Sequence, residues 1–376
     1  MQTVLISGAS VAGLALAHWL RRRGCVPTVV ERAPAVRPGG QAIDVRGVAL
    51  DVLDRMDLLD EARQARTRMR GMSMHDGEGN ELWRSTEMTY SSGRLDSDDI
   101  ELLREDLTEL LHRRVRAGRE AEFLFGDSIS ALDQGDDGVH VTLASGARRT
   151  FDYVVGADGL HSAVRRLAFG PDSDHLRHLG SHLGVFSTDN FLGLDNWQLW
   201  VQSESASYCL YPVRDNTQLR ATLGFMSQSL DYDHRDIEQQ KKLLAENMAS
   251  LGGDTPKLLV AMRSAPDFYF AAMAQVHMDS WTRGRVALVG DAGYCPSPLS
   301  GQGTSLALVG AYVLAEELGT SADPATALPR YEERMRPYVT LNQALATENP
   351  GQGASEESLT RAKNAITLGE MEGSGL

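Results

Sequence analysis

Three glycine-containing turns, each directly after an apolar run, constrain the fold of this chain more than any other feature. They are Gly8–Gly13 after Thr3–Ile6, Gly156–Gly159 after Tyr153–Val155, and Gly290–Ala292 after Val286–Val289, with Pro298 and Gly301-Gln302-Gly303 close behind. Short apolar runs bounded by glycine turns are typical of buried strands in an α/β sheet. Together the three turns predict one domain that holds a single dinucleotide.

The first turn has the physical features of a phosphate-binding loop. The chain turns tightly at Gly8, and a helix is expected to begin near Ser10. Glycine leaves room for a pyrophosphate, and the N-terminus of a helix offers free N–H groups and a partial positive charge. Ser10 stands where the usual Gly-x-Gly-x-x-Gly pattern has its middle glycine. The alternative is an ordinary β-α-β unit whose small residues serve helix–sheet packing.

An acidic residue follows at the expected distance. The strand Thr28-Val29-Val30 ends at Glu31, about 20 residues on, where a carboxylate accepts hydrogen bonds from a ribose hydroxyl.

Composition excludes several classes of protein. The chain has 376 residues and a net charge of −14 without a long basic run, so nucleic acid and acidic membrane surfaces are not expected partners. No apolar run approaches the ~20 residues that span a bilayer, and no secretory signal is recognised. Cys25, Cys209 and Cys295 lack the spacing of a metal site, which favours a reducing cytoplasm over a disulfide framework.

The pattern along the chain predicts two interleaved domains. Segments 1–70, 101–177 and 276–320 form the dinucleotide domain, and segments 71–100 and 178–275 form an antiparallel sheet that provides a wall for a substrate. A C-terminal helix is expected in 321–347. The tail from 348 to 376 is rich in Gly, Ser and Glu, and we expect it to be partly mobile.

These residues carry a resemblance to a known family. Asp158-Gly159 with Ser162 and Arg165, and Gly290-Asp291-Ala292 with Pro298 and Gly301-Gln302-Gly303, resemble the motifs of class A flavoprotein monooxygenases of the p-hydroxybenzoate hydroxylase type. The similarity covers roughly residues 1 to 340. Within that family, the segment 39–44 looks most like the tetracycline-inactivating branch and its relatives in antibiotic biosynthesis. The resemblance implies an α/β fold with a Rossmann-like FAD-binding domain, an antiparallel β-sheet substrate domain and C-terminal helices.

The resemblance also implies which residues bind non-covalent FAD. They are Gly8, Ser10, Val11, Ala12, Gly13, Glu31, Arg32, Asp44, Arg46, Arg104, Asp158, Gly290, Asp291, Pro298, Gly301, Gln302 and Gly303. Glu31 would bind the adenosine ribose with Arg32 beside the adenine, and Asp291 would hold the ribityl hydroxyls. Asp44 and Arg46 would lie near the flavin ring, Arg104 would reach the phosphates or the ribityl chain, and Asp158 would shape a groove shared with the nicotinamide cofactor. The helix that starts near Gly303 would point its N-terminus at the flavin.

Two of these residues have an alternative interpretation. Asp291 alone would serve as a helix N-cap, and Arg104 alone would be a solvated charge on a helix. Ser305 stands where many family members carry Asn, which puts a side-chain contact to the flavin in doubt.

The implied function is an FAD-dependent, NAD(P)H-consuming monooxygenase. Its chemistry would proceed through a flavin C4a-hydroperoxide, which passes one oxygen atom of dioxygen to a phenol, an enol or a polyketide-like ring. No catalytic side chains and no metal are expected, because the cofactor performs the reaction. NAD(P)H would be a transient co-substrate.

Polar substrate contacts are predicted at Gln198 and Arg220, with Trp200 in the pocket wall. Strand alternation places Gln198 and Trp200 on one face and Trp197 and Leu199 on the other, and leaves open which face lies toward the flavin.

Two other functions remain open at this point. One is a flavin-dependent oxidase or redox-neutral cyclase that inserts no oxygen, and the other is a non-enzymatic binder of flavin or another nucleotide. The sequence does not choose between NADH and NADPH, or between a biosynthetic and a resistance role. It also leaves open the substrate, the regiochemistry and the oligomeric state, although a monomer is compatible with it.

Overall fold

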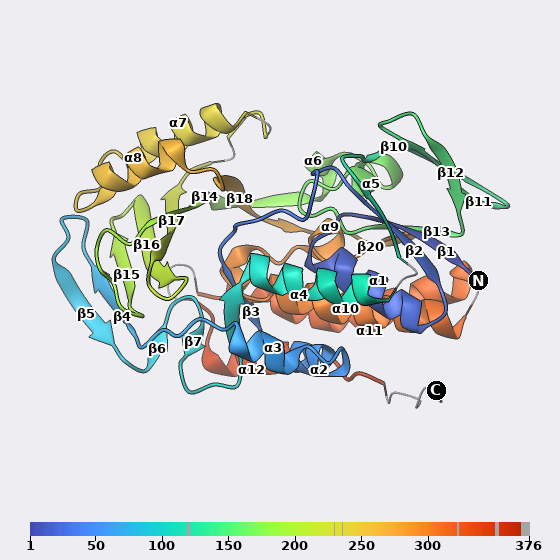
Figure 1. The fold of residues 1–376 in the computed structure, drawn as a ribbon, viewed down its shortest axis with the longest axis horizontal. Coiled ribbons are helices and arrows are strands. Elements are labelled where there is room, and N and C mark those ends of the chain that lie inside the picture. Colours follow the sequence, from blue (N-terminus) through green and yellow to red (C-terminus); the bar gives the residue numbers. More distant parts are fainter. Residues whose placement is uncertain (119–120, 229, 235, 322, 350–352, 370–376) are drawn as a thin grey trace.

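The structure, a computed structural model, describes residues 1–118, 121–228, 230–234, 236–321, 323–349 and 353–369. The chain forms two lobes that lie side by side, one built on a six-stranded sheet and the other on a seven-stranded sheet (Figure 1). We call them the six-stranded lobe and the seven-stranded lobe. Both helices and sheets are present, as the sequence predicts for an α/β fold.

The six-stranded sheet brings together strands that are far apart in the chain. In spatial order its strands are β19 (Thr282–Arg283), β20 (Val286–Leu288), β13 (Tyr153–Gly156), β1 (Thr3–Ser7), β2 (Val26–Glu31) and β9 (Glu122–Phe125). All pair in parallel except β19. Ser7 pairs with Gly156, and Gly156 pairs with Leu288. The carboxyl ends of β1, β13 and β20 therefore meet at one edge of the sheet, where the three glycine turns follow.

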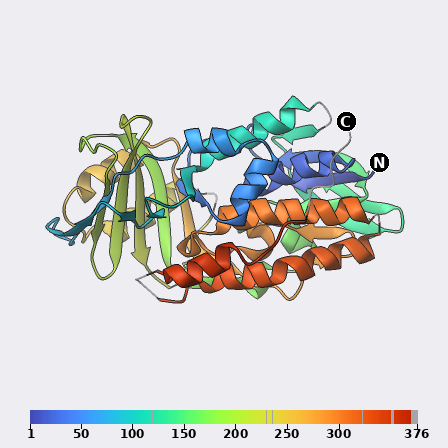
Figure 2. The ribbon, with the colours of Figure 1, turned by 90° about the horizontal axis from the view of Figure 1, so that it is seen from below.

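Helices cover this sheet. They are α1 (Val11–Arg22), α2 (Val48–Arg55), α3 (Leu59–Gln64), α4 (Arg104–Ala117), α5 (Ala163–Ala168), α6 (Asp172–His175), α9 (Asp291–Tyr294), the 3-10 turn η1 (Pro298–Ser300), α10 (Gly303–Thr320) and α11 (Pro324–Ala344). Helix α1 packs against α10 and α4 through an almost wholly buried surface. Figure 2 shows α10 and α11 running alongside each other.

Two small sheets complete this lobe. Strands β10 (Ile129–Gly135), β11 (Gly138–Leu143) and β12 (Arg148–Phe151) form an antiparallel meander, and β3 (Ala42–Val45) pairs with β8 (Ile100–Leu103). The spacing of leucines in the sequence predicts a helix from Leu102 to Ala117, but α4 begins only at Arg104, because Leu102 and Leu103 belong to β8.

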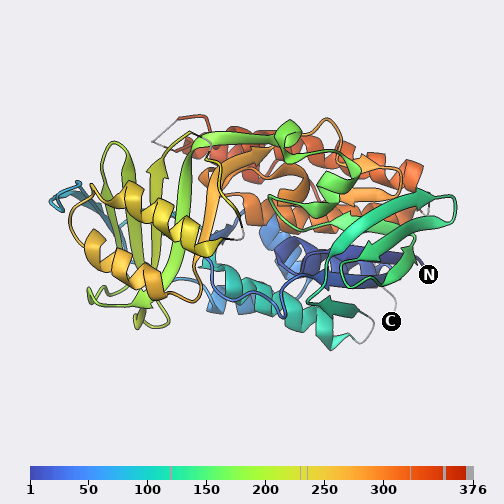
Figure 3. The ribbon, with the colours of Figure 1, turned by 90° about the horizontal axis from the view of Figure 1, so that it is seen from above.

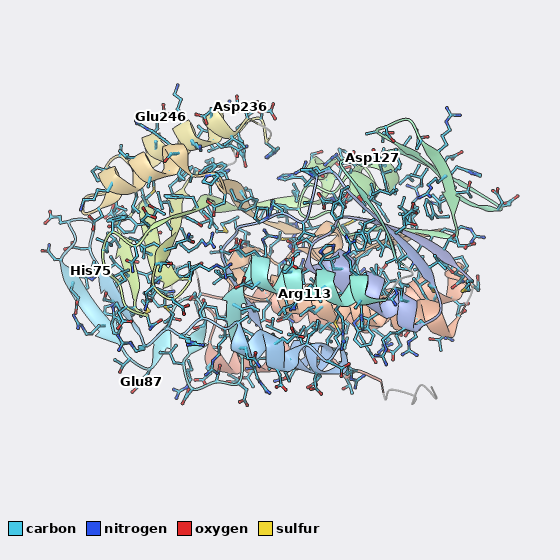
Figure 4. All side chains as sticks on the ribbon, in the orientation of Figure 1. His75, Glu87, Arg113, Asp127, Asp236 and Glu246 are labelled. Carbon is cyan, nitrogen blue, oxygen red and sulfur yellow. The ribbon has the colours of Figure 1, made fainter. Side chains whose placement is uncertain are left out.

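The seven-stranded sheet is mostly antiparallel. Its spatial order is β18 (Tyr269–Val276), β14 (Leu176–Asp189), β17 (Gln218–Met226), β16 (Ala206–Val213), β15 (Gln198–Gln202), β4 (Met72–His75) and β5 (Glu81–Ser85), and only β15 and β4 are parallel. The hairpin of β6 (Met88–Thr89) and β7 (Gly93–Arg94) follows β5. In Figure 4, His75 lies on the outer side of this lobe, whereas Arg113 of α4 lies in the six-stranded lobe.

One face of the seven-stranded sheet is covered by two helices. Helices α7 (Ile237–Met248) and α8 (Thr255–Ser264) lie across its strands in Figure 3. Leu244 and Leu258 pack there against Phe186, Leu210 and Leu223 of the sheet. The sequence predicts a helix from about Ile237 to Met248, which α7 confirms, whereas α8 is not predicted. The opposite face of the sheet is left to contact the six-stranded lobe.

A short helix docks part of the C-terminal tail, whose predicted partial mobility stays a prediction. Helix α12 (Glu356–Lys363) packs on α11, where Asn342 Nδ2 donates to the carbonyl oxygen of Ala362 at 3.0 Å. Lys363 Nζ lies 2.8 Å from Asp99 Oδ2, and Ile366 and Leu368 join the main core. Residues 353–369 are therefore an ordered part of the fold, because a few apolar side chains and one ion pair suffice to dock a short helix. The remaining tail positions, 350–352 and 370–376, lie outside the described residues.

Within the described part of the chain, no helix is long and apolar enough to cross a membrane. The same residues contain no cluster of His, Cys, Asp or Glu that could hold a metal ion.

Candidate cofactor and substrate site

The fold brings the three glycine turns into contact. A Cβ added to Gly8 would lie 2.5 Å from the carbonyl oxygen of Ala157, and one added to Gly290 would lie 3.1 Å from the Cβ of Ala12. Gly8 and Gly290 have φ values of +109° and +64°, which residues with a Cβ rarely adopt. A Cβ on Gly13 would approach the carbonyl oxygen of Gly8 to 1.9 Å. Backbone packing therefore requires glycine at these positions, and we call the three closely packed turns the cradle.

Two helix N-termini open toward these turns. Ser10 is the N-cap of α1 and Gln302 is the N-cap of α10, and in the described chain neither side chain caps its helix. The first turns of these two helices, both described, contain no acidic residue. Their N–H groups and positive dipole ends remain available to an anion such as a pyrophosphate or a reduced flavin.

Glu31 holds the first turn in shape. Its carboxylate accepts hydrogen bonds from the backbone N–H groups of Ala9 and Ala33, each at 2.9 Å. A carboxylate has about four acceptor positions, so capacity remains for a ribose hydroxyl. Arg32 is exposed beside it.

The carboxylate of Asp158 is occupied mainly by hydrogen bonds from other groups of the protein. Its carboxylate accepts from the N–H of Ala163 at 2.9 Å, from the hydroxyl of Ser7 at 3.2 Å and from the hydroxyl of Ser162. It thereby caps α5 and ties the second turn to β1. Burial raises its pKa, and these hydrogen bonds partly oppose that rise.

Asp291 lies at the N-terminus of α10. A Cβ on Gly303 would be 3.7 Å from Asp291 Oδ1. The side chain reaches solvent, yet the protein around it raises its pKa through desolvation. Both observations describe a carboxylate in a concave site. The N-cap of α9 is Gly290, so the alternative interpretation of Asp291 as an N-cap does not hold.

Arg104, the first residue of α4, binds the loop before β3 and is not a solvated helix charge. Its Nη2 donates to the carbonyl oxygens of Gly39 at 2.5 Å and Arg37 at 3.2 Å. A Cβ on Gly40 would lie 2.5 Å from Arg104 Nε, which is buried and has no partner among the described residues. Burial and the neighbouring Arg37 lower its pKa to about 10, so it remains cationic at neutral pH.

Asp44 and Arg46 form a buried ion pair beside the third turn. Asp44 Oδ2 lies 2.9 Å from Arg46 Nη2, and that nitrogen would lie 3.5 Å from a Cβ on Gly301. The backbone N–H of Arg46 donates to the hydroxyl of Ser305 at 3.0 Å. Burial raises the pKa of Asp44 to about 7, Arg46 opposes the rise, and Glu101 adds to it.

The loop between α9 and α10 supplies a further polar group. Pro298 opens η1 and is exposed, whereas Gln302 is fully buried. Both polar atoms of the Gln302 side chain lack a partner among the described residues. Unpartnered buried polar atoms are costly. This amide, Arg104 Nε, the glycine cradle and the two uncapped helices all fit a large polar cofactor such as FAD.

The structure answers which face of β15 lies toward this site. Trp200 packs with Leu103, Tyr211 and Ala42, and the hydroxyl of Tyr211 accepts from the N–H of Ala42 at 2.7 Å. Because Ala42 and Leu103 belong to β3 and β8, the face of Gln198 and Trp200 looks toward the six-stranded lobe. Leu199 packs on the opposite face, beneath α7 and α8.

Arg220 occupies the same face but is used as a clamp between the lobes. It is 1% exposed, and Nη1 lies 2.8 Å from Asp267 Oδ2 while Nη2 lies 3.1 Å from Glu105 Oε1. It also hydrogen-bonds to the hydroxyl of Ser187. Its predicted contact with substrate stays a prediction that this geometry does not favour.

Three residues of the site carried no signal in the sequence. The ring of Tyr269 lies under the guanidinium of Arg37 at 5.0 Å, and burial and Asp291 raise its pKa. Ser91 and Glu101 form hydrogen bonds beside Gln198 and Asp44. All these contacts join segments that are far apart in the chain, so local patterns could not reveal them.

Comparison with known proteins agrees with this geometry. The model of the FAD binding domain family matches residues 1–344. An uncharacterized protein of Mycobacterium tuberculosis (strain ATCC 25618 / H37Rv) is 52% identical over 371 residues, which cover 98% of this chain and 99% of that protein. A flavin-dependent monooxygenase from an unknown prokaryotic organism is 41% identical over 98% of this chain and 96% of its own length. The crystal structure of the tetracycline destructase Tet(55) superposes with a TM-score of 0.86 and 39% identity, covering 98% of this chain and 99% of that one.

Proposed function

This chain belongs to the FAD binding domain family and is a flavin-dependent monooxygenase, and from that premise we propose that it uses NAD(P)H and dioxygen to hydroxylate a planar polycyclic phenol or enol. The observation that carries the proposal is the face of β15 and β16 that bears Trp200 and Tyr211. This face looks across β3 and β8 toward the glycine turns. A ring-shaped substrate held there would lie beside the cofactor.

The residues of the six-stranded lobe would hold FAD. The turn Gly8–Gly13 and the N-terminus of α1 would take the pyrophosphate, and Glu31 would take the ribose. Arg104 would reach the phosphates or ribityl chain, and Asp291 would bind the ribityl hydroxyls. When bound, FAD supplies the redox chemistry with NAD(P)H and dioxygen. The N-terminus of α10 would stabilise negative charge on the reduced ring.

The residues of the seven-stranded lobe would position the substrate. Trp200 offers a flat apolar surface, and Gln198 offers an amide beside it that a polar ring substituent could contact. The chain resembles a tetracycline destructase over nearly its full length, which supports tetracycline-like fused rings as the substrate class. The proposed compartment is a reducing cytoplasm, because Cys25, Cys209 and Cys295 are all free and buried.

The first test is the colour and cofactor of the purified protein. We expect a yellow protein that releases FAD on denaturation, because the three turns form a cradle for a dinucleotide and a non-covalent cofactor leaves with the fold. A colourless protein that does not take up added FAD would contradict the proposal.

The second test is product analysis by mass spectrometry. The enzyme is supplied with NADH or NADPH under oxygen-18 gas and a panel of polycyclic phenols and enols that includes a tetracycline. One heavy oxygen atom per product is expected. An altered product without heavy oxygen would show an oxidase or a redox-neutral cyclase instead. An absence of substrate-stimulated NAD(P)H oxidation across the panel would favour a binding protein.

A further inference from the structure

A chain of three hydrogen bonds runs behind the substrate-side face of the seven-stranded lobe. Trp200 Nε1 donates to Gln198 Oε1 at 2.6 Å, and Gln198 Nε2 donates to the hydroxyl oxygen of Ser91 at 2.8 Å. The Ser91 hydroxyl hydrogen-bonds in turn to the carboxylate of Glu101. The chain therefore joins β15 to the loop between β6 and β7 and then to β8.

The chemistry of the groups fixes the direction of this chain. An indole N–H can only donate, so the amide oxygen of Gln198 must accept and its nitrogen must donate. Ser91 then accepts from Gln198 and uses its own proton toward Glu101. Glu101 also accepts from the hydroxyl of Thr67 at 2.6 Å. The indole and the amide therefore each have one role, whereas the Ser91 hydroxyl also lies 3.4 Å from Thr89 Oγ1.

Burial makes the arrangement costly to break. Gln198 is 0% exposed and Glu101 is 6% exposed, so water cannot readily replace a lost partner. The amide of Gln198 is therefore held in one of its two flipped orientations. The N–H edge of Trp200 is held with it.

The same loop is anchored on the cofactor side. Arg46 Nη2 donates to the carbonyl oxygen of Ser91 at 3.1 Å, pairs with Asp44 and lies against Gly301. Ser91 thus connects the third glycine turn to the wall that carries Trp200. A displacement of Ser91 would change the distance between the two.

An aromatic contact supports the indole from the outside. The ring of Tyr90 meets the ring of Trp200 edge-on at 5.5 Å, and Trp83 meets Tyr90 at 5.7 Å. Tyr90 is 47% exposed and Trp83 is 38% exposed. Because Tyr90 is partly exposed, the hydrogen bond to Gln198 is the buried constraint on the orientation of Trp200.

We propose that Ser91 and Glu101 are positioning residues, which hold the Gln198 amide and the Trp200 indole in one orientation so that a planar substrate rests against them. This inference rests on the proposed function for its effect on substrate. If the wall is misplaced, the substrate is poorly held and NAD(P)H is consumed with release of hydrogen peroxide instead of product.

A double-mutant cycle read by tryptophan fluorescence of the FAD-bound protein tests whether Ser91 positions Trp200. It requires no catalytic turnover. Four proteins are compared: wild type, Ser91→Ala, Trp200→Phe and the double variant. We expect Ser91→Ala to change the tryptophan emission and its quenching by acrylamide in the wild-type background and to change neither in the Trp200→Phe background. Equal changes in both backgrounds, or no change in either, would overturn the proposal.

The chain offers a matched control in the same loop. The hydroxyl of Ser92 lies 2.6 Å from Thr89 Oγ1, which lies 3.4 Å from the hydroxyl oxygen of Ser91, so Ser92 reaches Gln198 only through Thr89 and Ser91. Ser92→Ala should change the emission of Trp200 much less than Ser91→Ala does. Ser91→Thr restores a hydroxyl and should recover the wild-type emission, whereas a Thr variant that behaves like the Ala variant would contradict the assigned role.

A coupling measurement tests the functional half. Peroxide released per NAD(P)H consumed should rise roughly two- to tenfold in Ser91→Ala, the change expected from losing one buried hydrogen bond. The rise should vanish in the Trp200→Phe background and be reversed in Ser91→Thr. Wild-type coupling in Ser91→Ala would overturn the proposal. A wild-type enzyme that oxidises no NAD(P)H would instead refute the proposed function, while the fluorescence cycle would still decide the role of Ser91.

Discussion

The two lobes form their parts of the site through different kinds of contact. In the six-stranded lobe, close backbone contacts between turns shape the cradle, and the φ angles of Gly8 and Gly290 leave little room for other residues. In the seven-stranded lobe, side chains from separate strands meet in buried hydrogen bonds and ion pairs, as at Gln198 and Arg220. The first kind of site depends on a few glycines, and the second depends on partners that the fold must bring together.

The largest effect should come from the clamp of the seven-stranded lobe. Arg220→Ala would leave the half-buried carboxylates of Glu105 and Asp267 without their buried partner, which typically costs about 3–5 kcal/mol. The free energy of unfolding in urea measures this loss. Arg214 pairs with the same Glu105 at 2.7 Å but is 44% exposed in its side chain. Arg214→Ala should therefore cost about 1 kcal/mol or less, and equal losses in both variants would show that burial is not decisive here.

The second prediction concerns pH and the buried carboxyl of Asp44. Its pKa is raised from 3.8 to about 7, so between these values the unfolded chain has released a proton that the folded chain keeps. The contribution of Asp44 to the free energy of unfolding therefore falls as pH rises from about 4 to 7. The fall is at most roughly 4 kcal/mol, since one pKa unit corresponds to about 1.4 kcal/mol. Asp44→Asn should remove this loss, so the variant should gain stability relative to wild type over that range in urea unfolding curves.

Asp76 provides a control without pH dependence in this range. Its hydrogen bonds to Asn80 lower its pKa below 3.8, so its stabilisation is complete above about pH 4 and is lost only at lower pH. The stability difference between Asp76→Asn and wild type should therefore stay constant from about pH 4 to 7. If this difference changed with pH as it does for Asp44→Asn, burial of Asp44 would not be the cause.

The third prediction moves to the backbone-built cradle. Gly13→Ala would place a Cβ 1.9 Å from the carbonyl oxygen of Gly8, and because both atoms are fixed to the backbone the turn must shift. We expect a loss of roughly 1–3 kcal/mol in stability and about a hundredfold or more in FAD affinity. Fluorescence titration with FAD and thermal unfolding measure the two effects.

Gly24 offers the control for this clash. It has a φ of +77° but no atom within 4 Å of an added Cβ. Gly24→Ala should reduce stability through backbone strain and leave FAD affinity unchanged. A Gly13→Ala variant with normal FAD affinity would mean that the cradle tolerates movement.

The smallest effect should follow from a single side chain in the cradle. Asp291→Ala should preserve the fold, because the carboxylate is exposed rather than packed in the core. Loss of a charge-assisted hydrogen bond of ~1.5–3 kcal/mol to the ribityl chain predicts FAD binding that is weaker by roughly ten- to a hundredfold. Asp291→Asn, which keeps polarity without charge, should show an intermediate affinity. Equal affinity in wild type and Asp291→Ala would remove Asp291 from the cofactor site.

The fold was largely predictable where its signals are local. Apolar runs that end in glycine located β1, β13 and β20, and the helix predicted from about Ile237 to Met248 corresponds to α7. The start of α4 was misplaced because Leu102 and Leu103 belong to β8 and pair with β3. No local sequence pattern indicates this pairing. The helix α12 in the tail was not predicted, because its docking depends on the distant partners Asn342 and Asp99.

The sequence by itself determined the cradle, because a glycine that must adopt a positive φ or meet another backbone is constrained by its immediate surroundings. Only the tertiary structure decided which face of β15 meets the six-stranded lobe, since strand alternation defines two faces but not their neighbours. It also decided that Arg220 clamps the lobes and that Ser91 and Glu101 stand behind Gln198. Those roles depend on partners that are distant in the sequence and on burial, which strengthens polar contacts. Neither can be read from the sequence alone.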